Sequence, residues 1–127
     1  MRVRDVMKRE FAIVSPEATL AEIVSKFYPL DGDWAPVCEG SQLVGMIRYD
    51  DVARRVAKNG SLPATRARDL LSEEICYCFE NTRLSEAAAL MNENHVGSLP
   101  VVTAAGDLVG ILAREDIPSG ETLAAGD

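Results

Sequence analysis

The chain has 127 residues, 47% of them hydrophobic and 26% charged, which suits one ordinary globular domain or two very small ones. The net charge of −7 argues against a general nucleic-acid surface, and no apolar run approaches the ~18 residues that a membrane span needs. The N-terminus lacks the apolar core of a signal peptide, so three cysteines predict free thiols in a reducing cytoplasm.

Internal repetition is the strongest signal in the sequence. Arg2–Met7 matches Arg66–Leu71, and Pro36–Asp51 matches Pro100–Asp116, which is one residue longer in its turn. Each of the latter stretches holds two short apolar runs around a polar turn, a pattern typical of a β-hairpin. The chain is therefore built from one unit made twice.

The first repeat begins with a leader helix at residues 2–7 and an apolar strand at Phe11–Val14. A helix follows, because apolar residues recur on one helical face at Leu20, Ile23, Val24 and Phe27. Thr19 and Glu22 form a capping box at its start. The hairpin comes next, and a second helix spans about Tyr49–Asn59, ended by Gly60.

The second repeat follows the same order after a linker at Gly60–Thr65. Its leader helix is residues 66–71 and its first strand is Ile75–Phe79. The helical face that follows is made of Leu84, Ala87, Ala88 and Met91. After the hairpin, Pro118 ends the last helix within about one turn.

The predicted fold class is mixed α/β (α+β), with two tandem β-α-β-β-α repeats. Repeat 1 covers residues 1–60, a linker covers 61–65, repeat 2 covers 66–118, and 119–127 form a flexible C-terminal tail. Each repeat alone would bury little apolar surface, so both are expected to form one compact module.

Two such repeats, each with a Pro-Val hairpin that ends in an aspartate, resemble a tandem pair of CBS (cystathionine-beta-synthase) domains, the Bateman module. The match covers about residues 2–117. The resemblance implies pseudo-twofold symmetry and two clefts that hold adenosyl ligands such as AMP, ADP, ATP or S-adenosylmethionine. It also implies a role in regulating another protein, and assembly into dimers.

The resemblance also implies which residues line the clefts. The aspartate after each hairpin, Asp116 or Asp51, would accept hydrogen bonds from the two ribose hydroxyls, and backbone groups would read the adenine edge. One cleft would combine Asp116 with Ala12, Ile13, Val14, Gly97, Ser98, Leu99 and Pro100. The other would combine Asp51 with Cys76, Tyr77, Cys78, Asp33, Trp34, Ala35 and Pro36.

Several of these residues have a second interpretation. Asp51 and Asp116 could simply stabilise a helix N-terminus, and Trp34 could pack in an interface instead of stacking on a base. The family favours Thr or Ser three residues before the aspartate, where this chain has Arg48 and Ala113. Arg48 could grip a phosphate or block its cleft, and Ala113 offers no side-chain hydrogen bond.

The sequence shows no catalytic motif and no metal site. Cys38, Cys76 and Cys78 lack zinc-site spacing and are expected to be buried thiols, and the lone His95 has no second imidazole.

The leading hypothesis is a non-enzymatic regulatory module that needs no cofactor, binds an adenosyl ligand and signals to an unknown effector protein. It would be a cytoplasmic homodimer. The alternative is a pair with degenerate clefts that serves only for dimerisation or docking. We expect a ribose-bearing ligand to depend on Asp116 more than on Asp51, because Arg54 or Arg55 can pair with Asp51 within one helical turn.

Overall fold

The computed structural model describes residues 1–24, 34–59, 65–72 and 75–118. The chain divides into two units. We call residues 12–75 the first-repeat unit, and residues 1–11 together with 76–127 the second-repeat unit. These units do not follow the sequence repeats, because each one joins the body of one repeat to the leader of the other.

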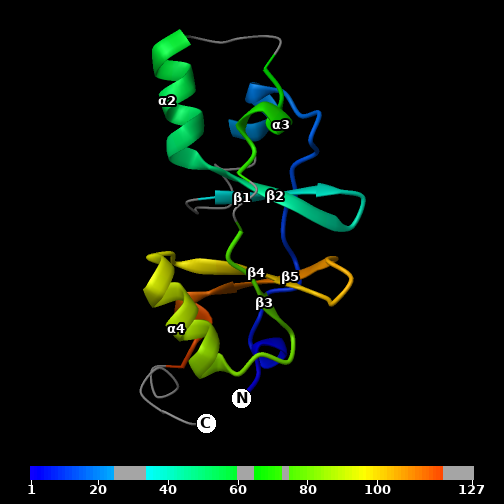
Figure 1. Cartoon of the computed structure of the whole chain (residues 1–127), viewed down its shortest axis with the longest axis vertical. Helices are drawn as coiled ribbons and strands as arrows, with labels where there is room; N and C mark the ends of the chain where they lie inside the picture. Colours follow the sequence, from blue (N-terminus) through cyan, green and yellow to red (C-terminus); the bar gives the residue numbers. More distant parts are fainter. Residues whose placement is uncertain (25–33, 60–64, 73–74, 119–127) are drawn as a thin grey trace. The chain divides into compact units, whose positions relative to one another are not determined.

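The first-repeat unit is built on an antiparallel hairpin of β1 (Trp34–Glu39) and β2 (Gln42–Arg48). The helix α2 (Tyr49–Asn59) follows β2 directly, and the short helix α3 (Ala67–Leu70) carries the leader of the second repeat (Figure 1). Residues 20–24 are helical, and the predicted capping box is present, since the Glu22 backbone N–H donates to Thr19 Oγ1 at 3.2 Å. The hairpin and α2 therefore confirm the sequence prediction.

The second-repeat unit has a three-stranded sheet in the order β3-β4-β5. The strands are β3 (Cys78–Phe79), β4 (Ser98–Val102) and β5 (Leu108–Ala113), with β3 parallel and β5 antiparallel to β4. The helix α4 (Leu84–Asn94) lies beside this sheet, and the one-turn helices η1 (Val3–Asp5) and η2 (Arg114–Asp116) begin and end the unit (Figure 1).

The first strand of each repeat is shorter than the sequence predicts. Of Phe11–Val14, only Val14 pairs with a neighbour, Val37, and Ile75–Tyr77 precede β3 without joining it. A turn follows each strand at once: the Glu17 N–H donates to Ser15 Oγ at 3.2 Å, and the Phe79 N–H donates to Thr82 Oγ1 at 3.0 Å. Both turns follow the strand, whereas the unpaired residues, Phe11–Ile13 and Ile75–Tyr77, precede it, so the turns fix only where each strand ends.

Each unit has its own buried apolar cluster. In the second-repeat unit it includes the predicted helical face together with Val3 and Met7 of the leader. In the first-repeat unit it includes Leu20 and Ile23, and Ala67 of the other leader. Val24, expected on the same helical face, is 44% exposed, and Phe27, Asp33, the linker at 60–64 and the tail at 119–127 lie outside the described residues.

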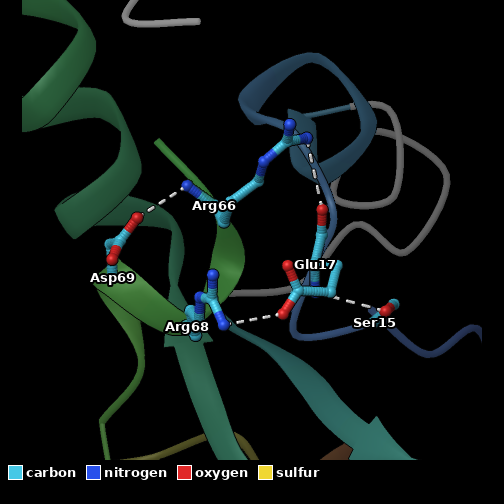
Figure 2. A network of polar contacts seen from close by, with 5 residues as sticks. All are labelled: Ser15, Glu17, Arg66, Arg68 and Asp69. Carbon is cyan, nitrogen blue, oxygen red and sulfur yellow. Dashed lines mark hydrogen bonds and ion pairs between the residues drawn. The ribbon is translucent and has the colours of Figure 1, made fainter. Parts of the chain in front are cut away.

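The two leaders hold their units by the same set of contacts. In the first-repeat unit the Arg66 N–H donates to Asp69 Oδ2 at 2.8 Å, and the Arg68 guanidinium pairs with Glu17 at 2.9 Å (Figure 2). In the second-repeat unit the Arg2 N–H donates to Asp5 Oδ2 at 2.8 Å, and Arg4 donates to the Asn81 side chain. The repeated Arg-x-Arg-Asp sequence is therefore a docking element that clamps the turn after the other repeat's first strand.

A glycine in each hairpin lets the end of a leader approach closely. A Cβ on Gly110 would lie 3.0 Å from the Lys8 carbonyl oxygen, and one on Gly45 would lie 2.8 Å from the Ser72 carbonyl oxygen. Lys8 exchanges two backbone hydrogen bonds of 2.9 Å with Ile111, and Ser72 exchanges two with Met46. Each leader thus adds one residue to the outer edge of a hairpin, next to the helix that carries the candidate aspartate.

Candidate functional site

The residues predicted for each cleft come from both units. In the second-repeat unit, β5 leads into η2, whose last residue is Asp116. The buried side chain of Ile117 anchors this turn in the apolar cluster, and its N–H donates to the Arg114 carbonyl at 3.1 Å. The end of the hairpin therefore fixes the position of the Asp116 carboxylate.

The Asp116 carboxylate has an unused acceptor. Its side chain is 22% exposed, and its Oδ2 atom is buried and accepts no hydrogen bond. The Lys8 ammonium lies 3.8 Å from this oxygen, beyond hydrogen-bond distance. Buried polar atoms in folded proteins are nearly always paired, so an orphaned oxygen of this kind calls for a further donor: a ligand hydroxyl, a water or an ion.

The Asp51 carboxylate is engaged differently. It lies in the first turn of α2, and its Oδ1 atom pairs with Arg54 at 3.3 Å, three residues further along the helix. Its side chain is 38% exposed. The predicted i,i+3 pairing with arginine is confirmed for Arg54. An arginine already bound to the carboxylate competes with ribose hydroxyls.

Arg114 binds the segment before β4 by hydrogen bonds. The Arg114 N–H donates to the Gly97 carbonyl at 2.8 Å, and its guanidinium donates to the Asn92 side chain and the Val96 carbonyl. Gly97 is exposed and Ser98 is half-buried, whereas Leu99 and Pro100 are buried. Within this unit, then, the exposed end of the predicted adenine segment is Gly97–Ser98.

Of the other residues predicted for the Asp116 cleft, Val14 is buried and tied to the hairpin. Its N–H donates to the Pro36 carbonyl at 2.9 Å, and its own carbonyl accepts from Cys38. Ile13 is 38% exposed, and Ala12 is half-buried. An exposed apolar side chain directly before a fixed strand residue is compatible with the predicted contact to an adenine ring.

The residues predicted for the Asp51 cleft show mixed exposure. Trp34, Ala35 and Pro36 are buried, and Arg48, which pairs with Trp34 across the hairpin, is exposed. Tyr77 is 46% exposed and packs edge-on against Phe79, with ring centroids 5.5 Å apart. An indole that is only 6% exposed leaves little ring surface for stacking on a base.

The three cysteines are free thiols, as predicted. Burial raises the pKa of Cys38 to about 11. Burial, with a smaller contribution from Cys76, raises the pKa of Cys78 to about 12. The pKa of Cys76 is also raised, by burial and then by Glu93, although Cys76 is only half-buried and its sulfur accepts a hydrogen bond from Asn94 at 3.2 Å. These shifts keep the thiols protonated and unreactive near neutral pH.

Comparison with known proteins settles the family. The family model of the CBS domain matches the chain twice, over residues 3–58 and 67–117. The chain belongs to the CBS domain family and is a tandem CBS pair. The CBS domain-containing protein YhcV of Bacillus subtilis is 32% identical over 115 residues, which are 91% of this chain and 81% of YhcV.

Other relatives show how the CBS pair occurs in larger proteins and with a ligand. The uncharacterized protein MJ1232 of Methanocaldococcus jannaschii is 27% identical over 117 residues. The matched segment covers 92% of this chain but only 38% of MJ1232. The crystal structure of CBSX2 in complex with AMP is similar at a TM-score of 0.75 and 25% identity, covering 91% of both chains. This likeness confirms the predicted fold class.

The CBS pair departs from its family pattern at the two positions three residues before the aspartates. Ala113 is half-buried opposite Ser98 in the sheet and carries no hydroxyl, and Arg48 is exposed at the end of β2. Sequence reasoning missed Lys8, which lies far from Asp116 in sequence. Lys8 aligns with Ser72 directly after the leader, but this alignment does not say which hairpin either residue joins.

No group of three or more His, Cys, Asp or Glu in the described ranges could hold a metal ion. Among the same residues, the CBS pair has no helix with the length and apolar character needed to cross a bilayer.

Proposed function

We propose that this CBS pair is a non-enzymatic regulatory module that binds an adenosyl ligand in the cleft of Asp116 and signals its occupancy to a partner protein. The observation that carries the proposal is the buried Asp116 Oδ2 atom, which accepts no hydrogen bond. A ribose offers two adjacent hydroxyl donors, and a carboxylate offers two acceptor oxygens at matching separation. Ligand binding would satisfy an acceptor that folding leaves unpaired.

The geometry favours Asp116 over Asp51 as the ribose-binding residue. Asp51 already binds Arg54, so a ribose would have to displace a charged donor. The Asp116 Oδ2 atom accepts no hydrogen bond and its ion pair with Lys8 is longer, at 3.8 Å, and the neighbouring Ala113 is small and uncharged. We therefore propose that the Asp116 cleft is the main ligand site and that the Asp51 cleft is weaker or empty.

The class of ligand is proposed from the related CBS pair that has been crystallised with AMP. AMP, ADP, ATP and S-adenosylmethionine all carry the adenosine that Asp116 and the exposed Gly97–Ser98 backbone would recognise. No cofactor is required by this proposal. The free thiols support a reducing cytoplasm as the site of action.

A second candidate function is a docking module with degenerate clefts. The half-buried Ala113 and the pairing of Asp51 with Arg54 favour it, because both remove polar groups that a ribose or phosphate could use. Under this proposal the pair would dimerise and bind its effector without a small molecule.

A thermal-shift screen separates the two functions. The intact chain is heated with and without AMP, ADP, ATP and S-adenosylmethionine, with GMP as the control for the base. A ligand at 100 times its dissociation constant adds about 2.7 kcal/mol of stability, which for a chain of this size raises Tm by roughly 10 °C. A shift with one adenosyl ligand and none with GMP supports the sensor. No shift with any of the four at millimolar concentration contradicts it and supports the docking module.

A further inference from the structure

The first leader brings a lysine to the candidate ribose site. Lys8 is held through its backbone, since its N–H donates to the Ile111 carbonyl at 2.9 Å and its carbonyl accepts from the Ile111 N–H at 2.9 Å. The absence of a side chain on Gly110 permits this approach. These backbone bonds keep the Lys8 ammonium within one side-chain length of Asp116, even when its ion pairs are broken.

The present partners of the Lys8 ammonium hold it weakly. It lies 3.3 Å from Glu115 Oε1 and 3.8 Å from Asp116 Oδ2. The Lys8 side chain is 52% exposed and the Glu115 side chain 76% exposed. Ion pairs between exposed side chains contribute about 0–1 kcal/mol, so the ammonium can exchange them for a better anion at little cost.

Two neighbouring cations of this unit have their partners elsewhere. Arg114 is bound to the Asn92 side chain and to the Val96 carbonyl, and Arg9 pairs with Glu80 at 3.5 Å. Among the described residues, Lys8 is the cation that forms ion pairs with Glu115 and Asp116.

We infer that Lys8 is a specificity-determining residue that selects adenosyl ligands carrying a phosphate on the ribose 5′ carbon. The inference rests on the proposed function. When a ribose hydroxyl donates to Asp116 Oδ2, the ammonium is released from that carboxylate and donates to the 5′-phosphate of the same nucleotide. A charged donor and a charged acceptor make one of the stronger hydrogen bonds in proteins.

The charge of the site makes this lysine decisive. Lys8, Glu115 and Asp116 together carry a net charge of −1, and a nucleoside monophosphate brings about two more negative charges. Without Lys8, two carboxylates would face the phosphate, while the neighbouring Arg114 and Arg9 are engaged with other partners. The equivalent position in the other unit is Ser72, which is uncharged and is held in the same way by Met46. The two repeats thus differ in the feature that would select a phosphate.

The test compares AMP with adenosine, which differ only in the 5′-phosphate. Calorimetry on the full chain at fixed ionic strength gives both dissociation constants for the wild type, Lys8→Met, Lys8→Arg and Arg9→Met. Lys8→Met keeps an unbranched side chain that lacks only the terminal ammonium position, and it keeps the backbone bonds to Ile111. Arg9→Met is the matched control, because it removes one positive charge from the adjacent residue.

We expect Lys8→Met to weaken AMP about tenfold or more, as the loss of a charge-assisted hydrogen bond does, and to leave adenosine unchanged. Lys8→Arg should restore most of the affinity for AMP, and Arg9→Met should change neither constant by much. Equal losses for AMP and adenosine, no loss for either, or a selective loss of AMP in Arg9→Met would overturn the inference. If neither compound binds the wild type, the proposed function itself fails.

Discussion

Gly110 offers the most direct test of how the leader is docked. A Cβ at this position would lie 2.7 Å from Met7 Sδ and 3.0 Å from the Lys8 carbonyl oxygen. The buried Met7 side chain can adjust in part, but the Lys8 carbonyl is fixed by its hydrogen bond to Ile111. Overpacking of this kind costs about 1–3 kcal/mol, and partial loss of the two leader hydrogen bonds adds about 1 kcal/mol.

We therefore expect Gly110→Ala to lower the free energy of unfolding by about 2–4 kcal/mol and Gly110→Val to lower it further. At roughly 4 °C per kcal/mol for a chain of this size, Tm should fall by about 8–16 °C in a calorimetric scan. Gly97→Ala is the control, because nothing lies within 4 Å of a Cβ built there. If Gly110→Ala melts within about 2 °C of both Gly97→Ala and the wild type, the leader is not docked at this hairpin.

Four further predictions follow from the packing and the thiols. A fragment of residues 12–75 holds the whole buried cluster of its unit, whereas a fragment of residues 1–60 lacks Ala67. The first fragment should therefore unfold more cooperatively in urea than the second. The reverse order would refute the exchange of leaders. In a reagent assay at pH 8, Cys76 should react first, and Cys38 and Cys78 only on unfolding, because their pKa values are raised by burial. The stability contributed by protonated Cys38 and Cys78 should be fully present below pH 9, the pKa of these thiols in the unfolded chain, and should decline as pH rises toward 11 and beyond. A free energy of unfolding that rises over this range would contradict the burial of these thiols. The chain should also be a homodimer by light scattering at micromolar concentration, since pairing of identical apolar surfaces is the common way to cover them, and a monomer alone would count against it.

Local patterns predicted the parts of the fold that depend on local physics. The hairpins follow from two short apolar runs around a polar turn, and the end of η2 follows from Pro118. The face of α4 was also correct, because Leu84, Ala87, Ala88 and Met91 are all buried. The first strands are shorter than the apolar runs predict, since Phe11–Ile13 and Ile75–Tyr77 lie before the residues that pair.

The exchange of leaders could not be predicted from the repeat. Both leaders have the same Arg-x-Arg-Asp sequence and the same capping contacts, so nothing local says which repeat each one docks against. The position of Lys8 beside Asp116 is a consequence of this exchange and was missed for the same reason. The candidate role of the aspartates follows from the resemblance to CBS domains, and the pairing of Asp51 with Arg54 from helical spacing.

The central claim is that Asp116 binds a ribose, and calorimetry on two matched variants tests it most directly. AMP, or whichever adenosyl ligand shifts Tm, is titrated into the wild type, Asp116→Ala and Asp51→Ala. Loss of a charged acceptor costs about 1.5–3 kcal/mol, so Asp116→Ala should weaken binding more than tenfold, and Asp51→Ala should have little effect. If Asp51→Ala alone abolishes binding, the ligand lies in the other cleft, and if neither substitution matters, Asp116 does not hold the ribose.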